Sequence, residues 1–333
     1  MMTSTEIGLL CVKFVSSHTE GGVIDISLAK EIIAALPNLY RNDYLFRIRF
    51  EDSFRYGLVN TSNRDEQFKP LRDFALILSN TMVKRPWVFS QLFVFHVITD
   101  LRGCSLLEIG GCLPECLLNL FSIAAYTGTG LDHCVSERES TTPSLSSTTK
   151  KHFVVCDIQA ETCLQFLPQA DRIFSTACLE HIHDLPIALE NCFNLTASAG
   201  YFYAYIAPIY SHLRAGQHGY IDKQSIPNLD DAVGLHLIPV EDQFRRLNRM
   251  GFTDGKSREI LAGLYFNRDI NHKYFEEYYI ALTGCSYYPV KIETMEDYSV
   301  IRRFLKEFKV VRRLNPRAIN VSAIAITCLL YKQ

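Results

Sequence analysis

The chain has 333 residues, of which 48% are hydrophobic and 21% are charged. This composition is typical of a globular protein and excludes a disordered or low-complexity chain, and the length suffices for one large domain or two smaller ones. The formal net charge of −2 gives no overall basic field, so we expect no nucleic-acid partner.

The 11 cysteines show neither a regular disulfide framework nor a C-x-x-C pair of the kind that binds metal. Several stand inside apolar runs, as small buried hydrophobic residues do. We therefore expect a reducing compartment, a cytoplasmic location and no resident metal. No apolar stretch reaches the roughly 18 residues of a membrane span, and the N-terminus lacks the pattern of a signal peptide.

Residues 1–100 are expected to form a mainly helical extension. Residues 24–39 have helical periodicity, and Pro37 is expected to end that helix. Residues 68–94 are apolar and aromatic, and two prolines divide them into helical pieces. No motif here carries chemistry, so the extension is expected to cap the later domain or to mediate self-association as a homodimer.

Residues 101–262 alternate short apolar strands with helical segments. The strands are expected at residues 105–109, 126–131, 153–156, 171–175 and 201–206, and the helices at residues 114–125 and 186–195. This alternation predicts an α/β fold with a doubly wound parallel sheet. The Ser- and Thr-rich residues 133–150 are expected to be a polar surface insertion.

The C-terminal part is expected to add a helical insertion and a last strand. Residues 263–316 are rich in Tyr, Phe, Arg and Lys and are expected to be mostly helical. The following run, residues 320–331, is rich in Val, Ile and Thr and is expected to return to the sheet. Residues 101–333 are therefore treated as one domain.

A glycine turn follows the first of these strands. In Leu106-Leu-Glu-Ile-Gly-Gly-Cys-Leu-Pro114, a strand feeds Gly110 and Gly111, and a helix follows. Glycines let the backbone approach a ligand closely, and a helix N-terminus offers free N–H groups. The alternative reading is an ordinary strand–helix turn.

Three carboxylates accompany the predicted strand ends. Glu108 precedes the glycines, Asp132 ends the second strand and Asp157 ends the third. The carboxyl ends of the strands form the ligand-binding edge of an open α/β sheet. Asp132 could there accept both ribose hydroxyls of an adenosine, and Asp157 could reach the adenine amino group. Each acid alone could equally be a turn or cap residue.

These segments together resemble the class I S-adenosylmethionine-dependent methyltransferases. Leu107-Glu-Ile-Gly-Gly111 looks like their first motif, residues 171–184 like their fourth-strand segment, and residues 197–205 like their fifth strand with its preceding turn. The resemblance covers roughly residues 101–262 and the last strand. It implies a Rossmann-like, doubly wound and mostly parallel seven-stranded sheet.

The resemblance also implies how the cofactor S-adenosylmethionine would be held. The glycine turn would pass close to the methionine moiety and the ribose, the strand-end acids would bind the ribose and adenine, and the end of the fourth strand would line the methionine side. The residues implied are Glu108, Gly110, Gly111, Asp132, Asp157, Ile158, Ser175 and Thr176. The chain departs from the family pattern at Pro114, which takes a glycine position, and at Ala199-Gly200, which replaces Pro-Gly-Gly.

Histidines follow the fourth and fifth strands, at the same predicted edge. His181, His212 and His218 are the candidate bases for a hydroxyl acceptor. The alternatives are a structural role for His181, a solvated loop for the other two, or a metal site, which no compact spacing supports.

The sequence thus predicts methyl transfer from S-adenosylmethionine to a small molecule or glycan, on oxygen. The alternative is a catalytically inactive methyltransferase-like binding or partner protein. A nicotinamide-dependent oxidoreductase would need a G-x-G-x-x-G turn, which is absent from the sequence.

Overall fold

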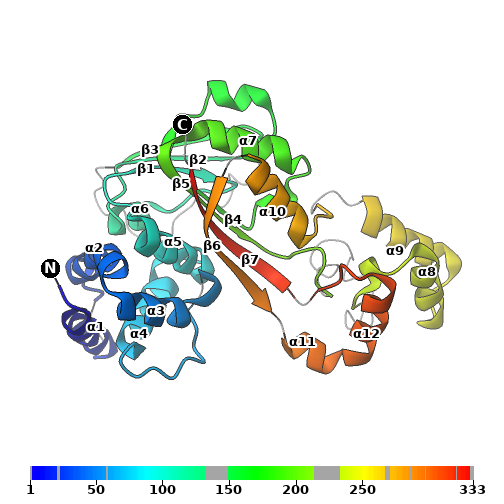
Figure 1. The fold of residues 1–333 in the computed structure, drawn as a ribbon, viewed down its shortest axis with the longest axis horizontal. Helices are drawn as coiled ribbons and strands as arrows, with labels where there is room; N and C mark the ends of the chain where they lie inside the picture. Colours follow the sequence, from blue (N-terminus) through cyan, green and yellow to red (C-terminus); the bar gives the residue numbers. More distant parts are fainter. Residues whose placement is uncertain are drawn as a thin grey trace.

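The computed structural model describes residues 2–20, 23–57, 59–131, 149–213, 233–266, 271–285, 287–296, 298–319 and 321–330. At its centre is a seven-stranded sheet with the strand order β3-β2-β1-β4-β5-β7-β6 (Figure 1). The strands are β1 Ser105–Ile109, β2 Ala125–Gly130, β3 Lys150–Val155, β4 Ala170–Thr176, β5 Thr196–Ile206, β6 Tyr287–Glu296 and β7 Val321–Leu330. Six of these strands run in the same direction, and β7 runs antiparallel to them, between β5 and β6. The predicted Rossmann-like, mostly parallel seven-stranded α/β fold is confirmed.

The order of the strands reverses next to β1. The chain adds β2 and β3 on one side of β1, then crosses to add β4 and β5 on the other side. In this register Ile109 pairs with both Thr129 and Ser175, so the carboxyl ends of β1, β2 and β4 lie together. Such a switch point opens a crevice where ligands of open α/β sheets bind.

Helices cover both faces of the sheet, as the alternation of the strand residues requires. Phe174 and Tyr203 pack with the N-terminal helices, whereas their neighbours Ile173 and Phe202 pack with the helices of the opposite face. The first face carries α1 Ser4–Thr19, α2 Ile26–Asn42, α3 Tyr44–Ser53, α4 Lys69–Met82, α5 Pro86–Thr99 and α6 Glu115–Leu120, and the second carries α7 Leu185–Leu195 and α10 Phe275–Gly284.

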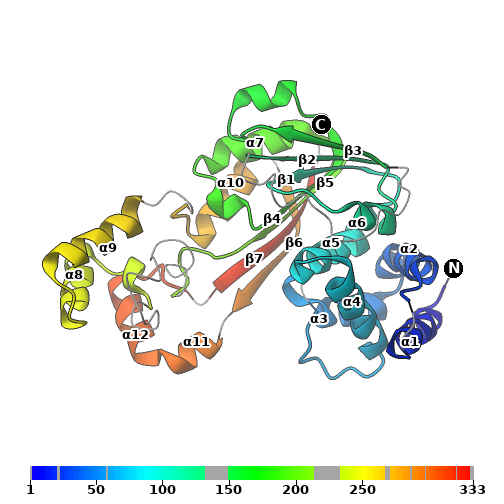
Figure 2. The same cartoon turned by 180° about the vertical axis from the view of Figure 1, so that it is seen from behind.

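Four further helices gather beyond the carboxyl ends of β5 and β6, away from the N-terminal helices (Figures 1 and 2). They are α8 Val240–Arg249, α9 Asp254–Phe266, α11 Tyr298–Arg303 and α12 Leu305–Leu314. Short 3-10 turns occupy Arg55–Gly57, Glu161–Gln165, Leu179–His181 and Leu235–Leu237. Within the described ranges, no helix has the length and apolar character needed to cross a membrane.

Helix α2 runs past Pro37, where we had expected it to end. A proline has no N–H for the carbonyl four residues earlier, which here belongs to Ile33. The buried His96 of α5 takes that place, because its Nε2 lies 3.0 Å from the Ile33 carbonyl oxygen. The Leu101 N–H donates to the other ring nitrogen at 3.2 Å, so the imidazole is neutral with its proton on Nε2. Burial lowers the pKa of His96 to about 4.

Two other expectations differ from the structure. The helix expected at residues 114–125 is only the short α6, Glu115–Leu120. Residues 263–316 include β6 as well as helices. β6 is an edge strand whose residues alternate between apolar and charged types, including the Lys291–Glu293 ion pair. Such a strand lacks the continuous apolar run of a central strand, and its place beside β7 is fixed by pairing with a distant segment.

Candidate active site

The glycine turn after β1 is wedged between β2 and the loop that follows β4. The Gly110 N–H donates to the Thr129 carbonyl at 2.7 Å, and Gly110 has φ +83°, which favours glycine. A Cβ at Gly110 would lie 2.2 Å from Cys178 Sγ, and one at Gly111 would lie 2.2 Å from a Glu108 carboxylate oxygen. Gly110 therefore requires glycine, and a side chain at Gly111 would have to displace the Glu108 carboxylate.

Glu108 holds the shape of this turn from inside. Its buried carboxylate accepts a hydrogen bond from the Leu113 N–H at 2.8 Å and another from the Tyr126 hydroxyl. Burial raises the pKa of Glu108 to about 7, against the lowering effect of these hydrogen bonds and of Lys151. Lys151 also donates to the Leu113 carbonyl at 2.8 Å. The orientation of the loop by Glu108 is thus explained by contacts within the chain.

The end of β3 places an exposed carboxylate at the same edge. Asp157 is exposed and accepts a hydrogen bond from the Gln159 N–H at 2.9 Å, which closes a local turn. Ile158 is buried in the core, and its carbonyl accepts from the Asn191 side chain at 2.8 Å. Asp132 and His218, two other predicted site residues, lie outside the described residues.

The end of β4 is tied closely to β1. Ser175 is fully buried, and its hydroxyl donates to the Ile109 carbonyl at 3.3 Å. Thr176 is 8% exposed at the last position of the strand. Ser175 therefore supports the turn from behind, and Thr176 is the nearer of the two to the open edge.

A buried acid that we had not singled out lies just beyond this strand. Glu180 is 1% exposed, and burial raises its pKa to about 8. The Ala207 N–H, which follows β5, hydrogen-bonds to its carboxyl group. Glu180 thus connects the loops that leave β4 and β5.

Asn271 also holds this loop, and no pattern in the sequence pointed to it. Its side-chain amide donates to the carbonyls of Leu179 at 2.8 Å and Ile182 at 2.6 Å. Its own N–H donates to the Glu180 carbonyl at 2.6 Å, and its side-chain oxygen accepts from the Tyr278 hydroxyl at 2.9 Å. The contact joins residues about 90 positions apart, so no local pattern could reveal it.

The candidate histidines occupy different environments. His181 and His183 are exposed after β4, whereas His212 is buried after β5. His272 lies between the two loops. Its ring stacks on that of Tyr210, with the ring centroids 4.7 Å apart, and it is near His183. Burial lowers the pKa of His272, and nearby His183 lowers it further.

The two loops thus meet at one edge of the sheet, as the parallel strand order predicts. The roles of His181 and His212 as bases stay predictions. No group of three or more His, Cys, Asp or Glu side chains in the described part of the chain is arranged to hold a metal ion.

Solved structures with a related arrangement include S-adenosylmethionine-dependent methyltransferases. One from Mesorhizobium loti has 9% identity and a TM-score of 0.41, with 72% of this chain and 96% of that chain covered. One from Archaeoglobus fulgidus has 16% identity and a TM-score of 0.40, with coverage of 76% and 98%. The cyclopropane synthase MmaA2 from Mycobacterium tuberculosis has 11% identity and a TM-score of 0.42, with coverage of 75% and 86%. No family model and no curated protein sequence matches the chain.

Proposed function

We propose that this chain is an S-adenosylmethionine-dependent methyltransferase that acts on an oxygen atom of a small molecule or glycan. The observation that carries the proposal is the position of the Gly110–Gly111 turn, at the carboxyl end of β1 where the strand order reverses. Nucleoside ligands bind at this place in open α/β sheets, and the glycines let them approach the backbone closely.

The residues at this edge fit an adenosyl cofactor. The backbone of the turn is open to close approach, because Gly110 and Gly111 carry no side chain. The exposed carboxylate of Asp157 follows the end of β3. In this proposal Asp132 holds the ribose, Asp157 and Ile158 frame the adenine, and Thr176 lines the methionine side. When bound, S-adenosylmethionine supplies an electrophilic methyl group attached to a sulfonium sulfur.

The chain itself would position the acceptor, exclude water and accept a proton. Methyl transfer is a direct displacement, so most of the rate enhancement comes from alignment. A hydroxyl acceptor also needs a base, and His181 is the first of two exposed histidines that follow β4. General-base assistance is typically worth about 10²–10⁴ in rate.

The cofactor is tested first, by calorimetry with S-adenosylmethionine, S-adenosylhomocysteine and NAD. We expect the two sulfur compounds to bind and NAD not to bind. Tight NAD binding without a response to either sulfur compound would overturn the proposal.

The base is tested by His181→Ala, with turnover and cofactor binding measured on the same protein. We expect turnover to fall while binding is kept, with His152→Ala on the exposed part of β3 as the control. His212→Ala and His218→Ala are measured in the same way. Wild-type turnover in all three variants would mean that none is the base.

A second candidate function is a methyltransferase-like protein that binds a ligand without turnover. Two features favour it. Cys112 and Pro114 take positions that are glycine in the usual first motif of the methyltransferases, and one oxygen of the Glu108 carboxylate accepts hydrogen bonds from the Leu113 N–H and the Tyr126 hydroxyl inside the turn. Cofactor binding without methylation of any acceptor would select this reading. A cytoplasmic location and a homodimer are also proposals, testable by cell fractionation and light scattering.

A further inference from the structure

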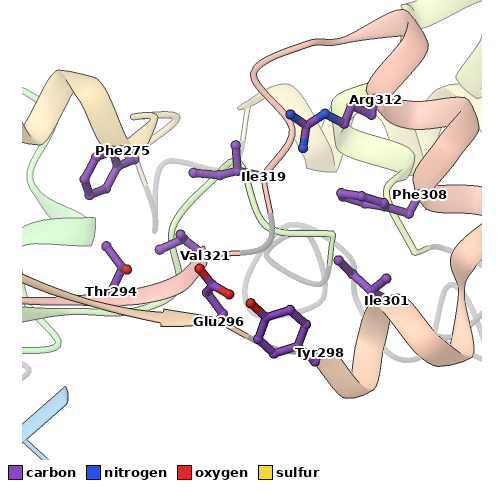
Figure 3. Close-up of a pocket in the computed structure, with 9 residues that line it drawn as sticks. All are labelled: Phe275, Thr294, Glu296, Tyr298, Ile301, Phe308, Arg312, Ile319 and Val321. Carbon is purple, nitrogen blue, oxygen red and sulfur yellow. The ribbon is translucent and has the colours of Figure 1, made fainter. Parts of the chain in front are cut away.

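A cavity of about 420 Å³ opens beside the last two strands of the sheet (Figure 3). Its walls come from the start of α10, the carboxyl end of β6, helices α11 and α12, and the segment that leads into β7. This volume lies within the range of about 300–1,000 Å³ that is usual for small-molecule sites.

The cavity lies next to the loop that carries a candidate base. Ile319, one of its wall residues, donates its N–H to the Ser211 carbonyl at 3.2 Å, and Ser211 directly precedes His212. The cavity is therefore at the carboxyl edge of the sheet, on the side of β5 and β7.

The cavity walls are polar at two opposite sides and apolar between them. Figure 3 shows the Arg312 guanidinium on one side and Glu296 and Tyr298 on the other. Phe308 and Ile319 contribute apolar surface between these polar groups. A matching ligand would have an apolar body with one polar group at each end.

The local charge favours an anion at the Arg312 side. Residues 298–314, which form α11 and α12, contain six basic side chains and one acidic one, which gives a net charge of 6 − 1 = +5. Within the described ranges, Arg312 has no carboxylate within ion-pairing distance. A guanidinium is planar and always charged, and it binds a carboxylate through two parallel hydrogen bonds.

We propose that this cavity binds an aromatic carboxylic acid that carries a hydroxyl at its far end. Its carboxylate would pair with Arg312, its ring would lie against Phe308 and Ile319, and its hydroxyl would face Glu296 and Tyr298. Aromatic rings add favourable ring contacts to the apolar area that they bury.

The further statement that this acid is the methyl acceptor rests on the proposed function. In that reaction the acceptor oxygen forms a bond to the methyl carbon, and the carbon–sulfur bond breaks with its electron pair left on sulfur. The hydroxyl proton passes to a base.

Calorimetry with 4-hydroxybenzoate as the probe tests the site on the full chain. We expect Arg312→Gln to weaken binding at least tenfold. Arg312→Lys should weaken it less, because lysine keeps the positive charge but lacks the planar guanidinium that makes two parallel hydrogen bonds. Arg313→Gln is the matched control, since this neighbour on α12 does not line the cavity. Thermal melts of each variant confirm folding, and Arg312→Lys keeps the test valid if Arg312→Gln does not fold.

Three outcomes would overturn the assignment. One is equal binding of 4-hydroxybenzoate and its uncharged amide. Another is the same loss of affinity in Arg312→Gln and Arg313→Gln. The third is binding of heparin or inorganic phosphate, but not of the aromatic acid, which would assign the basic helices to other anions.

A separate variant distinguishes this assignment from the cofactor proposal. Gly110→Ala should abolish binding of S-adenosylmethionine and leave binding of 4-hydroxybenzoate unchanged, because the turn does not line the cavity. If the wild-type chain binds the acid but not the cofactor, the proposed function alone is refuted. Binding of the cofactor without the acid would refute the cavity assignment alone.

Discussion

The hydrogen bond from His96 to the Ile33 carbonyl lets helix α2 continue through Pro37, and its loss should lower the stability of the protein. His96→Leu would leave two buried groups without partners, the Ile33 carbonyl and the Leu101 N–H. Each such group costs about 1–3 kcal/mol. We therefore expect the free energy of unfolding to fall by about 2–6 kcal/mol, measured by urea denaturation.

A double-mutant cycle with Pro37→Ala isolates the part of this cost that is due to the proline. Alanine at position 37 restores an N–H four residues after Ile33, so the carbonyl no longer depends on His96. In this background His96→Leu should cost less by about 1–3 kcal/mol, because only the Leu101 N–H loses its partner. The two substitutions are thus expected to be non-additive.

The control cycle combines Pro37→Ala with Thr99→Val. The Thr99 hydroxyl donates to the Phe95 carbonyl within α5 and makes no bond to α2, so these two changes should add. If the effects of Pro37→Ala and His96→Leu also add within about 0.3–0.5 kcal/mol, His96 does not replace the N–H that Pro37 lacks.

Three further predictions concern the glycine turn, the buried histidines and the ribose site. Gly110→Ala should destabilise the protein more than Gly251→Ala, measured by thermal unfolding, because both glycines have positive φ (83° and 89°) but only Gly110 would bring a Cβ against another side chain; equal losses would contradict this. Burial lowers the pKa of His96 and His236 to about 4, so the unfolded chain binds protons at a higher pH than the native state does. Stability that is complete above pH 6.5 should therefore be lost as the pH falls toward 4, by at most about 3 kcal/mol for each histidine; urea midpoints that stay constant from pH 7 to 5 would refute this. Asp132→Ala should weaken cofactor binding tenfold to a hundredfold in calorimetry, or about 1.5–3 kcal/mol, and unchanged affinity in the folded variant would place the ribose site elsewhere.

The amino-acid sequence alone determined the elements that local patterns define. The segments that become β1 and β7 are rich in apolar residues and mostly buried, so their composition and length identified them. The turn at Gly110 and Gly111 was also visible, because close backbone approach and positive φ demand glycine in the sequence itself. Parallel order then placed the ends of β1 and β4 at one edge.

Tertiary structure decided whatever depends on partners that are distant in the chain. A proline at position 37 predicts the end of a helix, yet α2 continues because His96, about 60 residues later, hydrogen-bonds to the Ile33 carbonyl. Strand β6 became a strand only by pairing with β7, and Asn271 gained its role from carbonyls about 90 residues earlier. The cavity at Arg312 is likewise assembled from five segments, because a concave site needs walls from several elements. Local sequence records propensity, turn chemistry and charge, whereas hydrogen-bond partners and cavities arise only when the folded chain brings remote residues together.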